Sequence, residues 1–100
     1  MDPANPDITI SDVVVSTAGR DQGELFYVIG EEPLYVILAN GKDRSLDKPK
    51  RQKRKHVQKV LRSETRVADK IRLGDKVLNG ELRRDLAFIA GHLQANNLGG

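Results

Sequence analysis

The fold of this chain is decided by residues 13–38, which read VVVSTAGRDQGELFYVIGEEPLYVIL. An apolar triplet at 13–15 leads into a polar loop that contains Gly19 and Gly23, and a second apolar run at 25–29 leaves it. β-Branched and aromatic residues bounded by glycines are typical of two strands joined by a tight loop. The glycines supply the positive φ angle or close backbone approach that such a loop needs. We expect the three residues between them to point outward: Arg20, Asp21 and Gln22.

Further strand signals follow this loop. Residues 34–39 form a third apolar run, and Asn40-Gly41 then predicts a type I′ hairpin. We therefore expect a fourth strand that pairs back onto the third, and a fifth, around residues 53–60, that covers the open edge. The pattern indicates a mainly β fold, a small SH3-like antiparallel barrel followed by one or two helices. The first four strands are expected at residues 12–16, 24–30, 34–39 and 42–46.

After residue 62 the apolar spacing becomes that of helices. Ser63 is expected to cap a short helix that ends at Leu73-Gly74, and Asn79 to cap a longer one. Apolar residues of the longer helix form one stripe. This stripe either packs on the open side of the barrel or docks a protein partner or a second copy of the chain. Its members are Leu82, Leu86, Ile89 and Leu93.

The central loop and its strands resemble the KOW motif, in which a Gly-basic-x-x-Gly loop joins two hydrophobic strands. Gln22 stands where the family often has lysine. With the basic residues that follow, the chain resembles the small bacterial KOW-domain RNA-binding proteins, which are similar to a large-subunit ribosomal protein of archaea and eukaryotes. The resemblance implies an SH3-like barrel that binds RNA. The matching residues are Val13, Val15, Gly19, Arg20, Asp21, Gly23, Phe26, Val28 and Gly30.

This interpretation divides the chain into three parts. Residues 1–7, with two prolines and no periodicity, are expected to be a flexible arm. Residues 8–62 are expected to form the KOW barrel, including a basic segment at 48–62. Residues 63–97 are expected to form a helical extension.

Composition limits the classes of function. The 100 residues suffice for one small domain with a mostly aliphatic core, because the chain has no Trp and only 4% aromatic residues. The absence of cysteine excludes disulfides and thiolate metal sites and favours a reducing cytoplasm. No apolar run approaches the roughly 18 residues that span a bilayer, and the acidic N-terminus is unlike a signal sequence. We expect a cytoplasmic protein with no membrane partner.

Charge is distributed unevenly along the chain. Residues 1–47 contain three Lys or Arg and nine Asp or Glu, a net charge of −6, whereas residues 48–100 contain fourteen and five, a net charge of +9. Residues 48–55 alone hold six cations. Such a run contacts RNA phosphates, is a solvated linker, or serves as a nuclear import signal. Beside a KOW-like loop we favour RNA contact.

Arg20 is the best single candidate for RNA contact, since a guanidinium can fork onto a phosphate or stack on a base. Its alternative is an ion pair with Asp21 or Asp12. Tyr27 or Tyr35 would add a stacking platform if exposed, whereas Phe26 is expected in the core. The complete set of predicted RNA-binding residues is Gly19, Arg20, Asp21, Gln22, Gly23, Arg44, Lys48, Lys50, Arg51, Lys53, Arg54 and Lys55, with Lys42 a weaker candidate.

No residue pattern points to catalysis, a cofactor or a metal. His56 and His92 lack second ligands at metal-binding spacing, and the chain has no nucleophile beside a base and no phosphate-binding glycine loop. We therefore expect a non-catalytic, monomeric RNA-binding protein whose target is ribosomal RNA or another translation-associated RNA. The alternative is a protein-interaction module that docks on an acidic partner, such as a ribosomal or transcription protein.

Overall fold

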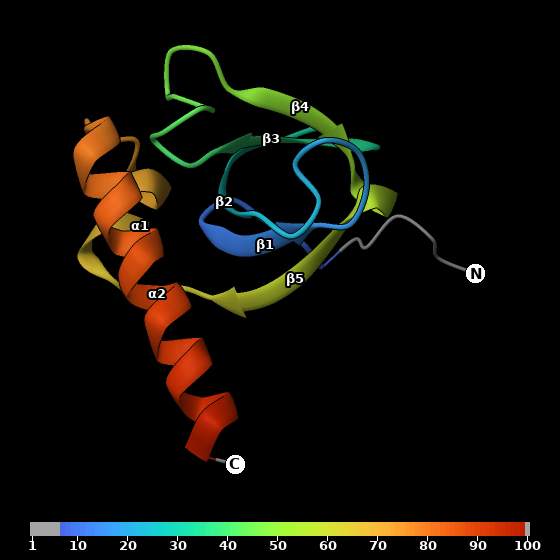
Figure 1. Cartoon of the computed structure of the whole chain (residues 1–100). Coiled ribbons are helices and arrows are strands. Elements are labelled where there is room, and N and C mark those ends of the chain that lie inside the picture. Colours follow the sequence, from blue (N-terminus) through green and yellow to red (C-terminus); the bar gives the residue numbers. More distant parts are fainter. Residues whose placement is uncertain (1–6, 100) are drawn as a thin grey trace.

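The computed structural model describes residues 7–99 as five strands, a 3₁₀ turn and two helices (Figure 1). The predicted arm at residues 1–7 lies, except for Asp7, outside the described residues. The mainly β prediction with C-terminal helices is confirmed. The elements are β1 (Asp12–Ser16), β2 (Leu25–Glu31), β3 (Tyr35–Ala39), β4 (Lys50–Lys53), η1 (Arg54–His56), β5 (Val57–Arg62), α1 (Arg66–Leu73) and α2 (Asn79–Gly99).

The five strands form one antiparallel sheet in the order β4-β3-β2-β1-β5. β1 to β4 are joined in sequence, and η1 then carries the chain from one edge strand to the other, where β5 pairs with β1. In Figure 1 the sheet is strongly curved, with β3 and β4 on one side and β1 and β5 on the other. The register of β2 against β3 shifts between Val28 and Gly30, which marks a β-bulge.

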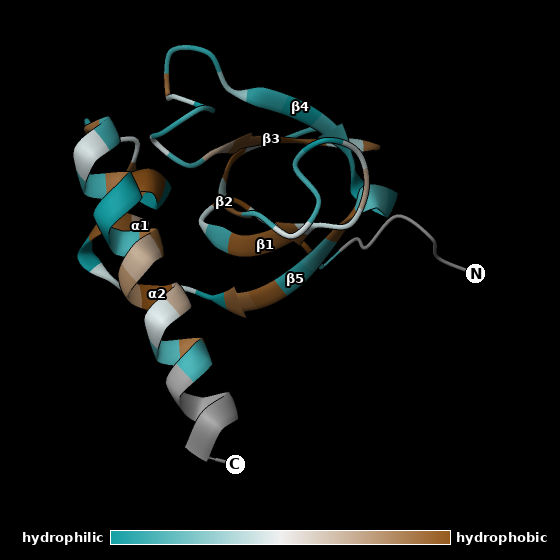
Figure 2. Cartoon of the chain, in the orientation of Figure 1, coloured by the Kyte–Doolittle hydropathy of each residue, from teal (hydrophilic) through white to brown (hydrophobic). Residues whose placement is uncertain are grey.

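Apolar side chains are buried on both faces of the sheet. Strand pairing aligns Val13, Tyr27 and Ala39 in one row across β1, β2 and β3, and this row packs against α1 and α2. Alternation places the neighbouring residues on the opposite, concave face, where they form a second cluster. Figure 2 shows the hydrophobic colouring of β1 and β3 beside the hydrophilic β4. The second cluster contains Ile8, Val14, Phe26, Val28, Val36, Leu38 and Val57.

The apolar stripe of α2 packs on the sheet, as the first of its two interpretations predicted. Leu82, Leu86 and Ile89 belong to the same buried cluster as Tyr27, and Leu93 packs against its edge. The second interpretation, in which this stripe is a docking surface, is wrong because the helix presents these side chains to the sheet. No helix in the described part of the chain is both long and apolar enough to cross a membrane.

The prediction of a fourth strand at residues 42–46 is wrong. The side chain of Asn40 accepts hydrogen bonds from the N–H groups of Lys42 and Arg44 at 2.9 and 3.0 Å, and the N–H of Asn40 donates to the Arg44 carbonyl at 2.8 Å. These bonds close a local loop in place of a two-residue hairpin. β4 begins only at Lys50, inside the basic run. The other strands were predicted more closely: β1 has the expected bounds, β2 and β3 lie within one residue of them, and β5 overlaps the expected fifth strand.

The loop after β3 also packs against the start of α2. Gly41 has a φ angle of 75°, and a Cβ atom there would lie 2.2 Å from the carbonyl oxygen of Asn79. Asn79 was predicted to cap α2, but its side chain instead accepts a hydrogen bond from the Leu46 N–H at 2.8 Å. The first turn of α2 is closed by Glu81, which accepts from the Leu78 N–H at 3.0 Å.

The first helix differs from its prediction at one end only. Its N-cap is Thr65, whose hydroxyl accepts a hydrogen bond from the Ala68 N–H, and not Ser63 as predicted. Gly74 ends the helix at a φ angle of 76°, as predicted. Ser63 is instead buried where the sheet contacts the helices.

That contact contains a buried cluster of polar groups around Tyr27. The Tyr27 hydroxyl donates to the carboxylate of Asp85 on α2 and is 2.8 Å from the Ser63 hydroxyl, while Thr65 donates to the same carboxylate at 2.9 Å. Burial, followed by the hydrogen bond to Asp85, raises the pKa of Tyr27 from 10.0 to about 12. Tyr27 was considered as an exposed stacking platform; this is wrong, because Tyr27 is completely buried and the helices cover the face of the sheet on which it lies.

We expect Tyr27→Phe to lower the free energy of unfolding by about 1–3 kcal/mol, because Asp85 and Ser63 lose a buried partner. Since the pKa of Tyr27 is higher in the folded than in the unfolded chain, its neutral hydroxyl stabilises the fold below pH 10. This contribution is lost as the pH rises through about 12. Urea unfolding of both proteins across this pH range measures it; a stability difference that does not shrink above pH 10 would contradict the assignment.

Candidate nucleic-acid interface

The loop between β1 and β2 has the compact backbone that its glycines predicted. Gly19 and Gly23 have φ angles of 79° and 91°. The N–H of Gly23 donates to the Ser16 carbonyl at 2.8 Å, and the N–H of Glu24 donates to the Asp21 carbonyl at 2.9 Å. These bonds hold the loop in one shape at the end of the β1–β2 pair.

Asp21 does not point outward as predicted; it is only 5% exposed. Its carboxylate lies 2.8 Å from Nη2 of Arg44 and 2.7 Å from Nζ of Lys50. Lys50 is the main cause that holds the pKa of Asp21 below its usual range, with Arg44 adding to it and burial opposing it. Two long side chains from later segments therefore cover the carboxylate, and Asp21 joins the loop to β4.

The six cations of the basic run divide into two groups. Lys50, Arg51 and Arg54 pair with acidic residues of the first half of the chain, on Asp21, Glu32 and Glu31 respectively. The other three are exposed, and their side chains make no ion pair within residues 7–99: Lys48, Lys53 and Lys55. Half of the run thus anchors β4 and η1, and half is available to a ligand.

Arg54 has an internal role that its place among the predicted contacts did not anticipate. It is buried, and its guanidinium donates to the carbonyl oxygens of Ile8 at 2.9 Å and Glu32 at 3.0 Å. A side chain with these partners does not reach the surface, so we leave Arg54 out of the candidate interface.

Arg20 remains an exposed candidate. Its alternative, an ion pair with Asp21 or Asp12, is not formed: Asp21 is bound by Arg44 and Lys50, and Asp12 lies 3.3 Å from Lys59. Gln22, at the next exposed position of the loop, is also at the surface. The loop therefore presents one free cation.

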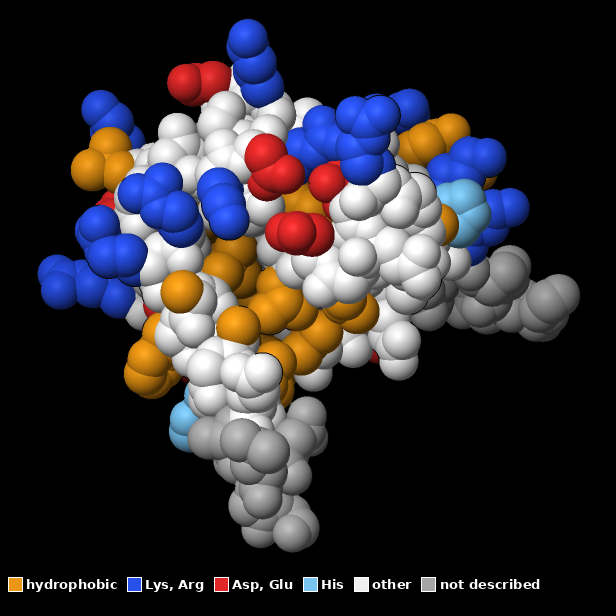
Figure 3. Space-filling view, in the orientation of Figure 1, with side chains coloured by type: hydrophobic (Ala, Val, Ile, Leu, Met, Phe, Trp, Pro, Cys, Tyr) orange, Lys and Arg blue, Asp and Glu red, His pale blue; other side chains and the backbone are white. Residues whose placement is uncertain are grey.

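A hollow of about 400 Å³ brings the loop and the basic segment together. One wall is formed by Ala18 and Gly19 of the loop, and the opposite wall by β4. Figure 3 shows Lys and Arg side chains gathered over β4 and the turn that follows it. The full lining is Ala18, Gly19, Tyr35, Lys50, Arg51, Gln52, Lys53 and His56.

Tyr35 and Arg51 form an ordered pair in this hollow. The guanidinium carbon of Arg51 lies 3.6 Å from the centroid of the Tyr35 ring, and the Glu32 carboxylate accepts from Nε at 3.0 Å and from Nη2 at 2.8 Å. Each residue stabilises the charged form of the other: Arg51 lowers the pKa of Glu32, and Glu32 raises the pKa of Arg51. The half-buried Tyr35 is thus covered by a cation on one face.

Sequence reasoning placed His56 among surface residues and did not select Gln52. Gln52 is buried, and its amide contacts the Ser16 hydroxyl and the His56 carbonyl at 3.2 and 3.3 Å. The alternation of β4 would have indicated an inward Gln52, but only if the strand itself had been recognised.

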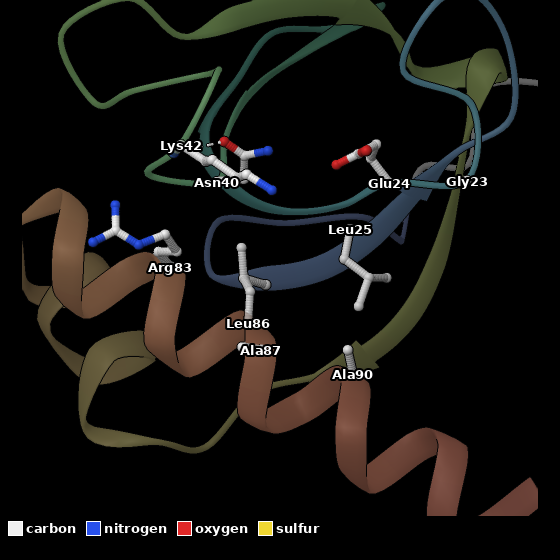
Figure 4. Close-up of a pocket in the computed structure, with 9 residues that line it drawn as sticks. All are labelled: Gly23, Glu24, Leu25, Asn40, Lys42, Arg83, Leu86, Ala87 and Ala90. Carbon is white, nitrogen blue, oxygen red and sulfur yellow. Dashed lines mark hydrogen bonds between the residues drawn. The ribbon is translucent and has the colours of Figure 1, made fainter.

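A second groove lies between the loops and α2 (Figure 4). It measures about 380 Å³, and Leu25 and Leu86 give it an apolar floor. Figure 4 shows Lys42 and Arg83 on one side and Glu24 on the other. Arg83 also donates to the Gly41 carbonyl at 3.1 Å. The groove is also lined by Gly23, Asn40, Ala87 and Ala90.

Across residues 7–99, no group of three or more His, Cys, Asp or Glu side chains could hold a metal ion. A comparison of the sequence with protein-family models finds no match, and a comparison with curated proteins finds none either. The resemblance of residues 13–30 to the KOW motif therefore rests on those residues themselves.

We expect Asp21→Asn to lower the free energy of unfolding by about 1–3 kcal/mol at pH 7, because two charged donors lose their acceptor. The pKa of Asp21 is lower in the folded chain than its ordinary 3.8, so its contribution is complete above that value and disappears as the pH falls through the lowered one. The two proteins should therefore converge in strongly acidic solution.

The matched control is Asp47→Asn, which neutralises an exposed carboxylate on the loop that precedes β4; it should change stability by less than about 0.5 kcal/mol. Urea unfolding monitored by circular dichroism measures all three proteins. Equal stability of Asp21→Asn and Asp47→Asn at pH 7 would show that Asp21 does not join the loop to β4.

Proposed function

We propose that this chain is a non-catalytic RNA-binding protein that binds structured RNA between its β1–β2 loop and β4. The observation that carries the proposal is the hollow whose walls are that loop and that strand. Lys53, which has no ion pair among the described residues, lines it, and Lys and Arg side chains gather over the strand. A rigid loop sets the orientation of the ligand, and the cations supply affinity through the phosphates.

The finer fold assignment is part of the same proposal. An antiparallel sheet in which the last strand pairs with the first, and whose concave face encloses an apolar cluster, supports an SH3-like barrel of the KOW kind. The positive φ angles of Gly19 and Gly23 support the motif further. From the resemblance to KOW-domain proteins, we propose ribosomal or another translation-associated RNA as the ligand.

Four cations are proposed to contact phosphates: Arg20, Lys48, Lys53 and Lys55. They are exposed and have no ion pair within the described residues. Each phosphate contact contributes roughly 0.7–0.9 to the magnitude of the slope of log K against log salt, so four contacts give a slope of about −2.8 to −3.6. Six contacts, the number of cations in residues 48–55, would give a steeper slope; three of those six are held by acids of the protein.

We expect a variant with Lys53→Ala and Lys55→Ala to bind structured ribosomal RNA fragments with a slope shallower by about 1.4–1.8, because it lacks two phosphate contacts. Fluorescence anisotropy across a salt series measures the slope. The matched control replaces Arg66 and Lys76, two exposed cations next to or within the helices, with alanine. It removes the same charge and should leave the slope unchanged.

If the slope became shallower by the same amount in the Lys53/Lys55 and Arg66/Lys76 variants, the effect would be one of net charge. That result would count against the proposed interface. Weak binding by the unaltered protein, with no dependence on salt, would remove the proposal altogether. Competition with DNA of the same sequence reports whether the site distinguishes the 2′-hydroxyl.

A protein partner is the second candidate, and the groove of Figure 4 favours it. An apolar floor beside Lys42 and Arg83 suits an acidic segment with an apolar anchor. Leu86 and Ile89 are each only 6% exposed, so substitutions there would disrupt the core. Ala87→Glu alters the groove at an exposed position instead. Loss of a salt-resistant complex in this variant, with RNA binding retained, would establish the protein interface.

A further inference from the structure

Arg51 is held in place by two different contacts before any ligand arrives. Glu32 accepts hydrogen bonds from its Nε and Nη2 atoms, and the Tyr35 ring lies against one face of its guanidinium at 3.6 Å. An arginine fixed in this way has already lost much of the side-chain freedom that ligand binding would otherwise remove. Its plane is therefore an ordered surface.

The second face of this plane is open. The Arg51 side chain is 55% exposed although Tyr35 covers one face and Glu32 covers the edge with Nε and Nη2. Glu32 and Tyr35 are the partners of Arg51 among the described residues, so we infer that its exposed surface includes the face turned away from Tyr35. A flat cation with one free face stacks well on a nucleic-acid base.

The hollow in front of Arg51 has the size and the chemistry for one nucleotide. Its volume of about 400 Å³ falls in the range of about 300–1,000 Å³ that small-molecule sites occupy. The side chain of His56 is half-buried in the lining and makes no hydrogen bond within the described residues, so its ring nitrogens can bond a base edge or a sugar. Lys53, at the same wall, can neutralise the phosphate.

We propose that this hollow holds one unpaired nucleotide of the RNA, with its base stacked on the free face of Arg51. The inference rests on the proposed RNA-binding function and specifies its ligand. In a continuous duplex both faces of every internal base are covered by neighbouring bases, so only a bulged, looped or terminal nucleotide can enter. The site thus selects RNA by the presence of an unstacked base, whereas the four free cations bind any phosphate chain.

The test compares two RNA hairpins with one shared duplex sequence, of which one carries a single bulged 2-aminopurine. We expect the protein to bind the bulged hairpin about 5- to 150-fold more tightly, the range that base stacking gives. Moving the 2-aminopurine out of the RNA stack and onto Arg51 should also change its fluorescence. Arg51→Lys keeps the charge and removes the plane, so it should abolish both the preference and the fluorescence change.

Arg62→Lys is the matched control. Arg62 is 54% exposed and pairs with Glu64 at 3.0 Å, much as Arg51 pairs with Glu32, but it has no aromatic partner among the described residues. The Arg62→Lys variant should keep the preference and the fluorescence change. Circular dichroism confirms that both variants are folded.

The outcomes separate this inference from the function on which it rests. Equal affinity for the two hairpins, with the steep salt dependence retained, overturns the nucleotide site and leaves RNA binding in place. An Arg51→Lys variant that retains the preference and the fluorescence change also overturns it. Absence of salt-dependent binding to either hairpin overturns the proposed function, and the nucleotide site with it.

Discussion

Arg44 and Lys50, from separate segments, both form ion pairs with the carboxylate of Asp21. The position of β4 depends on these ion pairs. β4 consists of polar residues, lies at an edge of the sheet and contributes no side chain to either apolar cluster. The hydrophobic effect therefore does little to place it. Its pairing with β3 and the ion pairs of Lys50, Arg51 and Arg54 hold it instead. Because the same Asp21 belongs to the glycine-bounded loop, one carboxylate sets the distance between the two walls of the hollow.

This arrangement also fixes the positions of the other cations in residues 48–55. Acids of the first half of the chain neutralise three of the six cations in the basic run, so the other three do not form a continuous repelling cluster. A disordered run of the same composition would lose conformational entropy when it binds, because binding would order it. Here much of this ordering takes place during folding, and the side chains ordered in this way include Arg51, which lines the hollow.

Strands β1 to β3 and the stripe of α2 were predictable because apolar periodicity and glycines report directly on burial and turns. β4 was not, since its sequence KRQK carries no apolar residue, and Asn40-Gly41 suggested a hairpin that the Asn40 side chain replaces with a local loop. The burial of Asp21 depends on cations 23 and 29 positions later in the chain. Such long-range pairing leaves no local signal. Sequence reasoning therefore found several residues of the candidate site, but it missed Gln52 and His56 and did not show which side chains face inward.

The row formed by Val13, Tyr27 and Ala39 has a consequence for how the chain can be divided. These side chains are completely buried, and the helices are what bury them. A fragment that ends at residue 62 would expose this row to water and leave the Tyr27 hydroxyl without Asp85, which would favour self-association over a stable monomer. The sheet and the helices therefore share one buried core, and the boundary between residues 62 and 63 separates two kinds of secondary structure without separating two cores.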